Sequence, residues 1–384
     1  MINKNIRKSL LVYLVVTIPL LSQEKPDTTK TETDSTKTKP TIKSLTKGSK
    51  AIGGLFTFFQ DTTNGSVQML IQKKQLNKEF IHFVHTLDGV VDVGHFRGAY
   101  KSSKIFEIRK YFNRVEFEIQ NSSFYFDPAN PLSKASNANI STAVLASEYI
   151  AAESDSLIMV SVDNVFLTEA LHQISRSVNP LSKNKNPFKL GRLVKNRTKY
   201  SKLKNYPKNT DISVQYVYSN PSPTNWGSDA GLTDARSVNV TLQHSFIEMP
   251  KNNYTPRYED PRVGYFVTEI TDMTTADDVT PYKDLIHRWH LEKKYPEQFV
   301  SVPVEPIVWW IENTTPLEFR DAIKDGVLAW NRAFEKAGFN KALEVKTQPD
   351  DADWDAGDIR YNVLRWTSSP NPPCSRFDPL VPSS

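Results

Sequence analysis

Between residues 51 and 126 the chain consists of short runs in which apolar and polar residues alternate. The runs are GLFTFFQ, SVQMLIQ, FIHFVHTL, KIFEIRK, RVEFEIQ and SFYF, and Asn64-Gly65 separates the first two. A period of two is typical of strands with one buried face, and Asn-Gly of a tight hairpin. Further runs at LIMVSVD, DISVQYVYS and SVNVTLQHSF extend the pattern, with a short helix expected at Ser141–Ala152. We therefore predict a mainly antiparallel β region from residue 48 to about residue 275.

The pattern changes after Thr280. Residues 281–295 (PYKDLIHRWHLEKKY) have the spacing of an amphipathic helix, and residues 306–312 (PIVWWIE) that of a buried strand. Thr315 then stands at a predicted helix N-cap, Pro316 at the first helical position and Glu318 where it would close a capping box. Gly338 supplies the stop, so a helix of about 22 residues is predicted.

One face of this helix is apolar, and the residues on it are Phe319, Ile323, Val327, Trp330 and Phe334. Strands are predicted next at 343–346 and 359–366. The order strand, long helix, strand, strand is that of the beginning of an α/β domain. The predicted fold class is therefore α+β, with a mainly antiparallel N-terminal region followed by an incomplete α/β segment.

The N-terminus has the features of an export signal. Lys4, Arg7 and Lys8 precede an apolar run at 10–21, which is shorter than the roughly twenty residues that span a bilayer. We expect cleavage after Ser22, with an uncleaved anchor as the alternative, and no stable membrane span in the mature chain. Residues 23–47 are rich in Thr and Lys and predict a disordered linker. The protein is then periplasmic, cell-surface or extracellular.

Composition narrows the possible partners. About 335 residues remain after the linker, enough for two or more domains. Cys374 is the only cysteine, so no internal disulfide is expected. The net charge is +5, yet the stretch 170–210 holds eleven Lys or Arg residues and no acidic residue. This stretch could contact an anionic glycan or lipid surface, or be a solvated loop, and export argues against a nucleic-acid partner.

Histidines are the first candidates for chemistry. His287 and His290 stand three apart on the predicted helix, with Asp284 and Glu292 nearby, but two ligands do not make a tight metal site. His82 and His85 fall on one strand at an odd separation, which sends them to opposite faces. His95 is not tied to either by spacing. We expect structural roles for all of these residues.

The acidic run near residue 350 follows part of the pattern of a calcium-binding loop. Asp351, Asp353 and Asp355 alternate as the first ligands of an EF-hand would, with Gly357 and Asp358 after them. The required glycine and the final bidentate Glu fall instead on Ala356 and Asn362, so an acidic turn is the preferred interpretation, with weak calcium binding as the alternative.

Several reaction templates are absent from the sequence. There is no G-x-G-x-x-G, no P-loop and no G-x-S-x-G, and none of the seven histidines is followed by Glu, so H-E-x-x-H is missing. Cys374 lies next to Pro372 and Pro373 and is expected to be an incidental thiol. No residue is therefore assigned as catalytic, metal-binding or cofactor-binding.

Several segments resemble a known family. They are FRDAIKDGVLAWNRAFEKAGF, ALEV, DADWDAGDIRYNVLRW and TSSPNPP in the C-terminal third, and GLFTFFQ, RTKYSKLKNYPKNTDISV and YTPRYEDPRVGYF upstream. Together they are similar to exported bacterial zinc-dependent metallopeptidases of the metzincin-like type, which carry two uncharacterised N-terminal domains. The resemblance covers about residues 45–373.

The resemblance implies peptide-bond hydrolysis on a peptide or protein substrate. In the family an H-E-x-x-H-x-x-G-x-x-H helix supplies three imidazoles to zinc, and its Glu acts as general base on the zinc-bound water. That helix follows the TSSPNPP segment, where this sequence stops matching. We expect a chain truncated before the zinc helix, inactive by itself and binding no zinc. The alternative is an exported β-rich module that binds glycan, peptide or an anionic surface.

The N-terminal patterns predict a signal peptide (1–22) and a disordered linker (23–47). For the rest of the chain the resemblance implies an N-terminal β accessory domain (48–95), a second β-rich accessory domain (96–295), the start of a metallopeptidase catalytic domain (300–373) and a divergent tail (374–384).

Overall fold

The computed structural model of the protein describes residues 40–174, 186–227, 231–274 and 282–366. The expected signal peptide, the tail at 374–384, Cys374 and most of the expected linker lie outside the described residues. The last residues of that linker contain a one-turn helix, α1 (Ile42–Leu45), whose N-cap Thr41 accepts a hydrogen bond from the Ser44 amide. Within the described residues, no helix is both long and apolar enough to cross a membrane.

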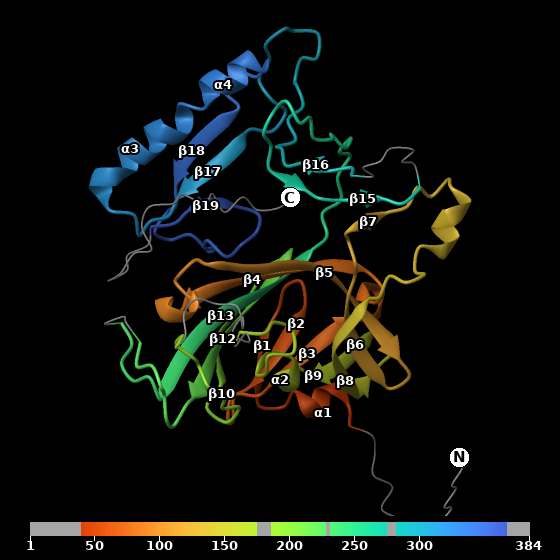
Figure 1. The fold of residues 1–384 in the computed structure, drawn as a ribbon, viewed down its shortest axis with the longest axis vertical. Coiled ribbons are helices and arrows are strands. Elements are labelled where there is room, and N and C mark those ends of the chain that lie inside the picture. Colours follow the sequence, from red (N-terminus) through yellow and green to blue (C-terminus); the bar gives the residue numbers. More distant parts are fainter. Residues whose placement is uncertain (1–39, 175–185, 228–230, 275–281, 367–384) are drawn as a thin grey trace, which may run out of the picture. The chain divides into compact units, whose positions relative to one another are not determined.

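Twelve strands form one sheet in which every neighbouring pair is antiparallel (Figure 1). The strands are β1 (Ser49–Ile52), β2 (Thr57–Asp61), β3 (Val67–Gln72), β4 (Glu79–Asp88), β5 (Tyr100–Tyr111), β6 (Arg114–Ile119), β8 (Ala143–Glu153), β9 (Leu157–Ser161), β10 (Arg192–Leu193), β11 (Lys199–Asn205), β12 (Asn209–Ser219) and β13 (Ser237–Glu248). The order along the sheet is β1-β2-β3-β9-β8-β6-β5-β4-β13-β12-β10, and β11 also pairs with β12. This confirms the predicted antiparallel β region. Strands on both sides of the expected boundary between residues 95 and 96 pair within it.

Most strands of this sheet bury one face in the core, because apolar and polar residues alternate along them, whereas β12 is buried on both faces. In β3, for example, Val67, Met69 and Ile71 are fully buried while the residues between them are half-buried. The short helix α2 (Asp163–Phe166) adds Val165 and Phe166 to the same core. Three 3-10 helices, Lys73–Gln75, Val91–Val93 and Pro131–Ala135, lie between strands.

The two ends of the sheet are held together. The amide of Leu55, which follows β1, donates to the carbonyl of Tyr206, which follows β11, at 2.8 Å. The Asn205 side chain donates to the carbonyls of Ile52 and Phe56. The edge that β1 would otherwise present is therefore partly occupied by this chain itself.

The helix expected at Ser141–Ala152 is wrong. From Ala143 on, these residues belong to β8, which pairs with β6 and β9. The sequence AVLASEYIAAE is rich in helix-forming residues, but pairing on both sides satisfies the backbone groups and overrides that preference. Both pairings contain a register shift, which explains why the alternation along β8 is hard to recognise.

The amphipathic helix expected at 281–295 is also wrong. The described part, 282–295, is extended or irregular and contains only the short strand β16 (Leu285–Ile286), which pairs with β14 (Val267–Thr268). The amides of Lys283 and His287 donate to the carbonyls of Ile270 and Phe266, so partners distant in sequence replace the helical ones. A second small sheet joins β7 (Phe124–Tyr125) and β15 (Thr271–Asp272) in parallel.

Residues 300–366 form an α/β segment. Its sheet has three parallel strands in the order β18-β17-β19: β17 (Ile307–Ile311) lies between β18 (Leu343–Thr347) and β19 (Asn362–Leu364). Helices α3 (Leu317–Leu328) and α4 (Asn331–Lys336) connect β17 to β18 and lie along one side of this sheet (Figure 1). The predicted strand, helix, strand, strand order is present, so the α+β class is confirmed.

The start of the long helix differs from the prediction. Pro316 is the N-cap, with an extended ψ of 141°, and no side chain caps the helix, so the expected capping box is absent. Arg320 explains the difference: its guanidinium donates to the carbonyls of Asn313 and Thr315 and holds the entering loop. Satisfying these carbonyls fixes the loop without the Thr315 hydroxyl.

The helix is also interrupted, since α3 ends at Leu328 and α4 begins at Asn331. The Asn331 side chain exchanges two hydrogen bonds with the backbone of Leu343, at 2.9 and 3.1 Å, which ties this turn to β18. Gly338 ends α4 with a φ of 91°, as predicted. Neither helix contains a buried residue, and Phe319 and Trp330 of the predicted apolar face are exposed.

Candidate functional site

A chain of hydrogen bonds joins two histidines and a tyrosine inside the core of the large sheet. His82 Nε2 of β4 lies 3.0 Å from His244 Nδ1 of β13, and His244 Nε2 lies 2.8 Å from the hydroxyl of Tyr216 on β12. That hydroxyl donates to the carbonyl of Phe166 at 2.8 Å. The two imidazole rings are stacked 5.3 Å apart.

The Tyr216 hydroxyl determines which atoms donate and which accept along this chain of hydrogen bonds. Because Tyr216 donates its proton to a carbonyl, it accepts from His244 Nε2–H, and His244 Nδ1 then accepts from His82 Nε2–H. His82 Nδ1 is left as a buried acceptor without a hydrogen-bond partner. Each imidazole therefore carries one proton and is neutral.

Electrostatics agree with neutral rings. Burial lowers the pKa of His82 well below its usual value, and lowers the pKa of His244 to about 3, with His172 nearby adding to both effects. Burial also raises the pKa of Tyr216 above its ordinary value. His82 and His244 are each 1% exposed, so neither can reach a substrate, and the network organises the core.

The second polar cluster joins the large sheet to the α/β segment, and we call it the junction. It consists of Tyr206, Asn209 and Asp211 at the start of β12, with Asp355, Gly357 and Ile359 in the turn before β19. Asn209 Nδ2 donates to the Gly357 carbonyl at 2.8 Å, and Asn209 Oδ1 accepts from the Ile359 amide at 3.1 Å. Tyr206 donates its hydroxyl proton to Asp355 Oδ1 at 2.5 Å.

The two carboxylates of the junction, Asp355 and Asp211, differ in how many of their oxygens have a partner. Asp355 is paired with the Lys204 ammonium of β11 and accepts from the Gly357 amide. Asp211 is 3% exposed and accepts from Asn209 through Oδ1, while its Oδ2 has no hydrogen-bond partner. A Cβ on Gly357 would stand 2.4 Å from this Oδ2, so only glycine fits over the carboxyl. Burial raises the pKa of Asp211 to about 6.

Replacing Asp211 by Asn is expected to stabilise the protein at alkaline pH. A carboxyl whose folded-state pKa is raised from 3.8 to about 6 weakens the fold as pH rises through this window, and the loss is complete above it. We expect Asp211→Asn to raise the free energy of unfolding by about 1–3 kcal/mol at pH 8 and to have little effect at pH 4. Urea unfolding at the two pH values measures this, and equal effects at both would contradict the interpretation.

The histidines singled out near residue 290 do not come together. His287 Nε2 lies 2.8 Å from the Thr268 hydroxyl, whereas His290 Nε2 lies 3.2 Å from Glu292 and its ring packs on Tyr254. In the part of the chain that the structure describes, no three His, Cys, Asp or Glu side chains are grouped as a metal site requires.

The remaining candidates also have structural partners. His82 and His85 do lie on opposite faces of β4, and His95 Nδ1 lies 3.3 Å from the Thr86 hydroxyl. Of the acidic run, Asp351 and Asp353 are exposed, and Asp355 belongs to the junction. Asp358 forms a bidentate pair with Arg360, so these carboxylates do not converge on one point.

The basic stretch at 170–210 lies partly on an edge strand. Its residues 175–185 are outside the described structure. On β11, Lys199 and Lys202 are exposed, whereas Lys204 pairs with Asp355. Lysines on an edge strand discourage pairing with a second chain, and the same side chains are available to an anionic surface.

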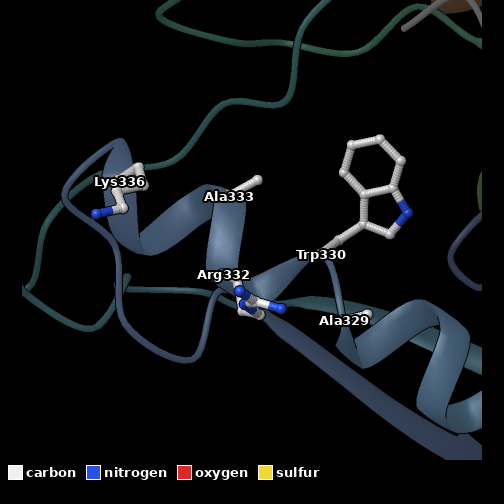
Figure 2. A pocket seen from close by; sticks show the side chains of 5 residues that line it. All are labelled: Ala329, Trp330, Arg332, Ala333 and Lys336. Atoms are coloured by element: carbon white, nitrogen blue, oxygen red, sulfur yellow. The ribbon is translucent and has the colours of Figure 1, made fainter.

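A shallow surface depression accompanies the break between α3 and α4 (Figure 2). It is lined by Ala329, Trp330, Arg332, Ala333 and Lys336. The Trp330 ring projects from the helix and is 66% exposed. The residues that line it include neither a carboxylate nor a histidine, so they offer no usual metal ligand.

Sequence reasoning missed His244 and Asn209. His244 could have been found, because it takes a core position in the alternating run Val238, Val240, Leu242, His244, Phe246, just as His82 does between Phe80 and Val84. Asn209 gave no local signal, since its partners Gly357 and Ile359 are about 150 residues away.

The fold and these two clusters define an α+β protein in which a large antiparallel sheet carries a small parallel α/β segment. Residues 100–294 match the family model described as a domain of unknown function (DUF5117), and the chain belongs to this family. No curated protein and no solved structure matches the chain. The matched residues include β5 to β16 and end before the α/β segment.

Proposed function

We propose that this chain is the N-terminal part of a secreted zinc-dependent metallopeptidase. In this proposal the large sheet belongs to its accessory domains, and residues 300–373 begin its catalytic domain. The observation that carries the proposal is the α/β segment held at the junction. Its order of strand, helix, strand and strand is the order that the family resemblance implies for the start of the catalytic domain.

Zinc would supply a Lewis acid and a water of lowered pKa to such an enzyme. The described residues do not fit a zinc site, because His287 and His290 have separate partners and no third ligand joins them. In this proposal the metal ligands and the general base lie outside this chain. We therefore derive no catalytic step for these residues.

The chain's own part is to position the α/β segment. Asn209 binds the turn before β19 through both ends of its amide, and Asp355 binds Tyr206 and Lys204. These contacts place the turn on β12, a strand that is buried along nearly its whole length. A rigid sheet beneath the beginning of a catalytic domain would fix the orientation of later elements.

The test uses the full gene product that contains this chain, with the 384-residue chain as control. We expect the full product to bind about one zinc per molecule and to hydrolyse casein. Inductively coupled plasma mass spectrometry measures the zinc content. A chelator should abolish hydrolysis, and added zinc should restore it. The control chain should show neither property. A zinc-free, inactive full product would refute the proposal.

The alternative binding module is favoured by the exposed Lys199 and Lys202 on β11. Retention of the 384-residue chain on heparin at physiological salt, lost when both lysines are replaced by serine, would support that alternative. Because the two experiments use different proteins and measure different quantities, each can fail independently.

A further inference from the structure

The outer face of the large sheet carries a row of three side chains across β5, β6 and β8. Tyr111 pairs with Arg114, and Arg114 pairs with Tyr149. Paired residues of antiparallel strands share a face, and Val115, the neighbour of Arg114, is fully buried in the core. The row therefore points away from the core, with one tyrosine on each side of the arginine.

Both tyrosines are unusually accessible for aromatic residues in a regular sheet. Tyr111 is 52% exposed and Tyr149 is 68% exposed. Strands lie roughly 5 Å apart, so the backbones of Tyr111 and Tyr149 are separated by about 10 Å. The two tyrosines thus place exposed aromatic side chains on either side of one guanidinium.

The hairpin between β5 and β6 orients one of these rings. Phe112 sits at the turn with a φ of 49°, a left-handed conformation that bulky residues rarely adopt, and is 81% exposed. Its ring packs perpendicular to that of Tyr111 with centroids 4.8 Å apart, while the Arg114 guanidinium lies 5.4 Å from the Tyr111 centroid. These two contacts orient the Tyr111 ring, which stays 52% exposed.

The charges around the row are balanced. Arg114 is 3.7 Å from Glu116, and Arg109 contacts Glu107 at 3.0 Å and Glu118 at 2.7 Å. Each of these two arginines therefore has a carboxylate partner. A surface with compensated charges and exposed aromatic rings is complementary to a ligand that is neutral but rich in hydroxyl groups.

We propose that the Tyr111–Arg114–Tyr149 row is a binding platform for a neutral oligosaccharide. One sugar ring packs its C–H face on each tyrosine, and Arg114 and Glu116 hydrogen-bond the hydroxyls between them. The spacing of the rings suits a short glycan lying across the strands. An anionic membrane is the poorer match, because each nearby cation already has a carboxylate partner. This inference is independent of the proposed peptidase function.

Affinity electrophoresis of the 384-residue chain tests the platform. Native gels would contain one of a panel of neutral polysaccharides: β-glucan, cellulose ether, xylan, galactomannan, mannan or starch. We expect retardation in at least one gel, little changed by salt. Replacing Tyr111 or Tyr149 by alanine should weaken binding about tenfold each, the loss of one stacked ring. Tyr100→Ala is the matched control, since Tyr100 lies on β5 and is 51% exposed but outside the row.

Circular dichroism melting checks that the variants are folded. Retention of binding by Tyr111→Ala and Tyr149→Ala, or equal loss in Tyr100→Ala, would overturn the platform. Absence of retardation in every gel of the panel would overturn it as well. Binding confined to heparin or to phosphatidylglycerol vesicles, and removed by salt, would assign the chain an anionic partner instead.

Discussion

Replacing Phe246 by alanine is expected to lower the free energy of unfolding by about 3–5 kcal/mol, the cost of removing a large buried aromatic side chain. Phe246 lies on β13, between β4 and β12 in the sheet, and is 1% exposed. Its ring has five aromatic neighbours, with centroid distances between 4.6 and 6.3 Å to Phe56, His82, Phe106, Phe117 and Phe166.

The size of the effect comes from the position of these neighbours. They belong to β4, β5, β6, α2 and the loop just before β2, so a cavity at Phe246 removes contacts from five segments at once. Elements fixed in several strands cannot all move inward to fill the space, and a cavity that cannot collapse is the costlier kind. His82 would also lose one wall of the apolar environment that surrounds its bond to His244.

Urea unfolding monitored by fluorescence measures the change. Phe299→Ala is the matched control, because Phe299 is 91% exposed and its loss should change stability by less than about 0.5 kcal/mol. Should Phe246→Ala fail to fold, Phe246→Leu retains most of the volume and is expected to cost about 1–2 kcal/mol. Equal stability of the Phe246 and Phe299 variants would show that the ring cluster does not support the core.

The antiparallel region could be predicted because most of its strands have one face in the core. The apolar residues of that face, such as Val67, Met69 and Ile71, recur at every second position. In β8 this alternation is disturbed by register shifts against both neighbours, and its alanines favour a helix in isolation. Whether such a segment forms a strand or a helix therefore depends on pairing partners that are distant in the sequence.

The long helix shows the same limit in finer detail. Its existence and its end at Gly338 follow from local residues. Its start depends on Arg320 binding the preceding loop, and its interruption depends on Asn331 binding the backbone of Leu343. Both are contacts between elements, so a capping pattern read from the sequence could not anticipate them.

The candidate clusters were predictable to different extents. Strand geometry alone predicts that His82 and His85 lie on opposite faces of β4. The hydrogen bond between His82 and His244 depends on the register of β4 against β13, which cannot be predicted from either strand's own residues. The junction depends on residues about 150 positions apart, Asn209 and Gly357, and Asp355 is more readily taken for part of a calcium loop than for a partner of Tyr206.

Acidification from pH 7 to about pH 4.5 is expected to destabilise the protein strongly. His82 and His244 are buried and His85 is half-buried. Desolvation keeps all three neutral: it lowers the pKa of His82 well below its usual value, that of His85 to about 4 and that of His244 to about 3. In the unfolded chain the same groups bind protons below about pH 6.5. The unfolded state therefore holds more protons in this window, and stability falls as pH falls.

Asp211 acts in the opposite direction, because its raised pKa, about 6, lets the folded state bind one proton that the unfolded chain binds only near pH 4. Three histidines opposed by one carboxyl leave a net loss of about 2–3 kcal/mol per pH unit below pH 6. Urea unfolding at half-unit pH intervals gives this slope. His85→Asn should make it shallower by about one proton, and Asp211→Asn should make it steeper by about one, since it removes the opposing group. A flat profile, or the same slope in both variants, would mean that the folded protein does not hold these histidines neutral and does not raise the pKa of Asp211.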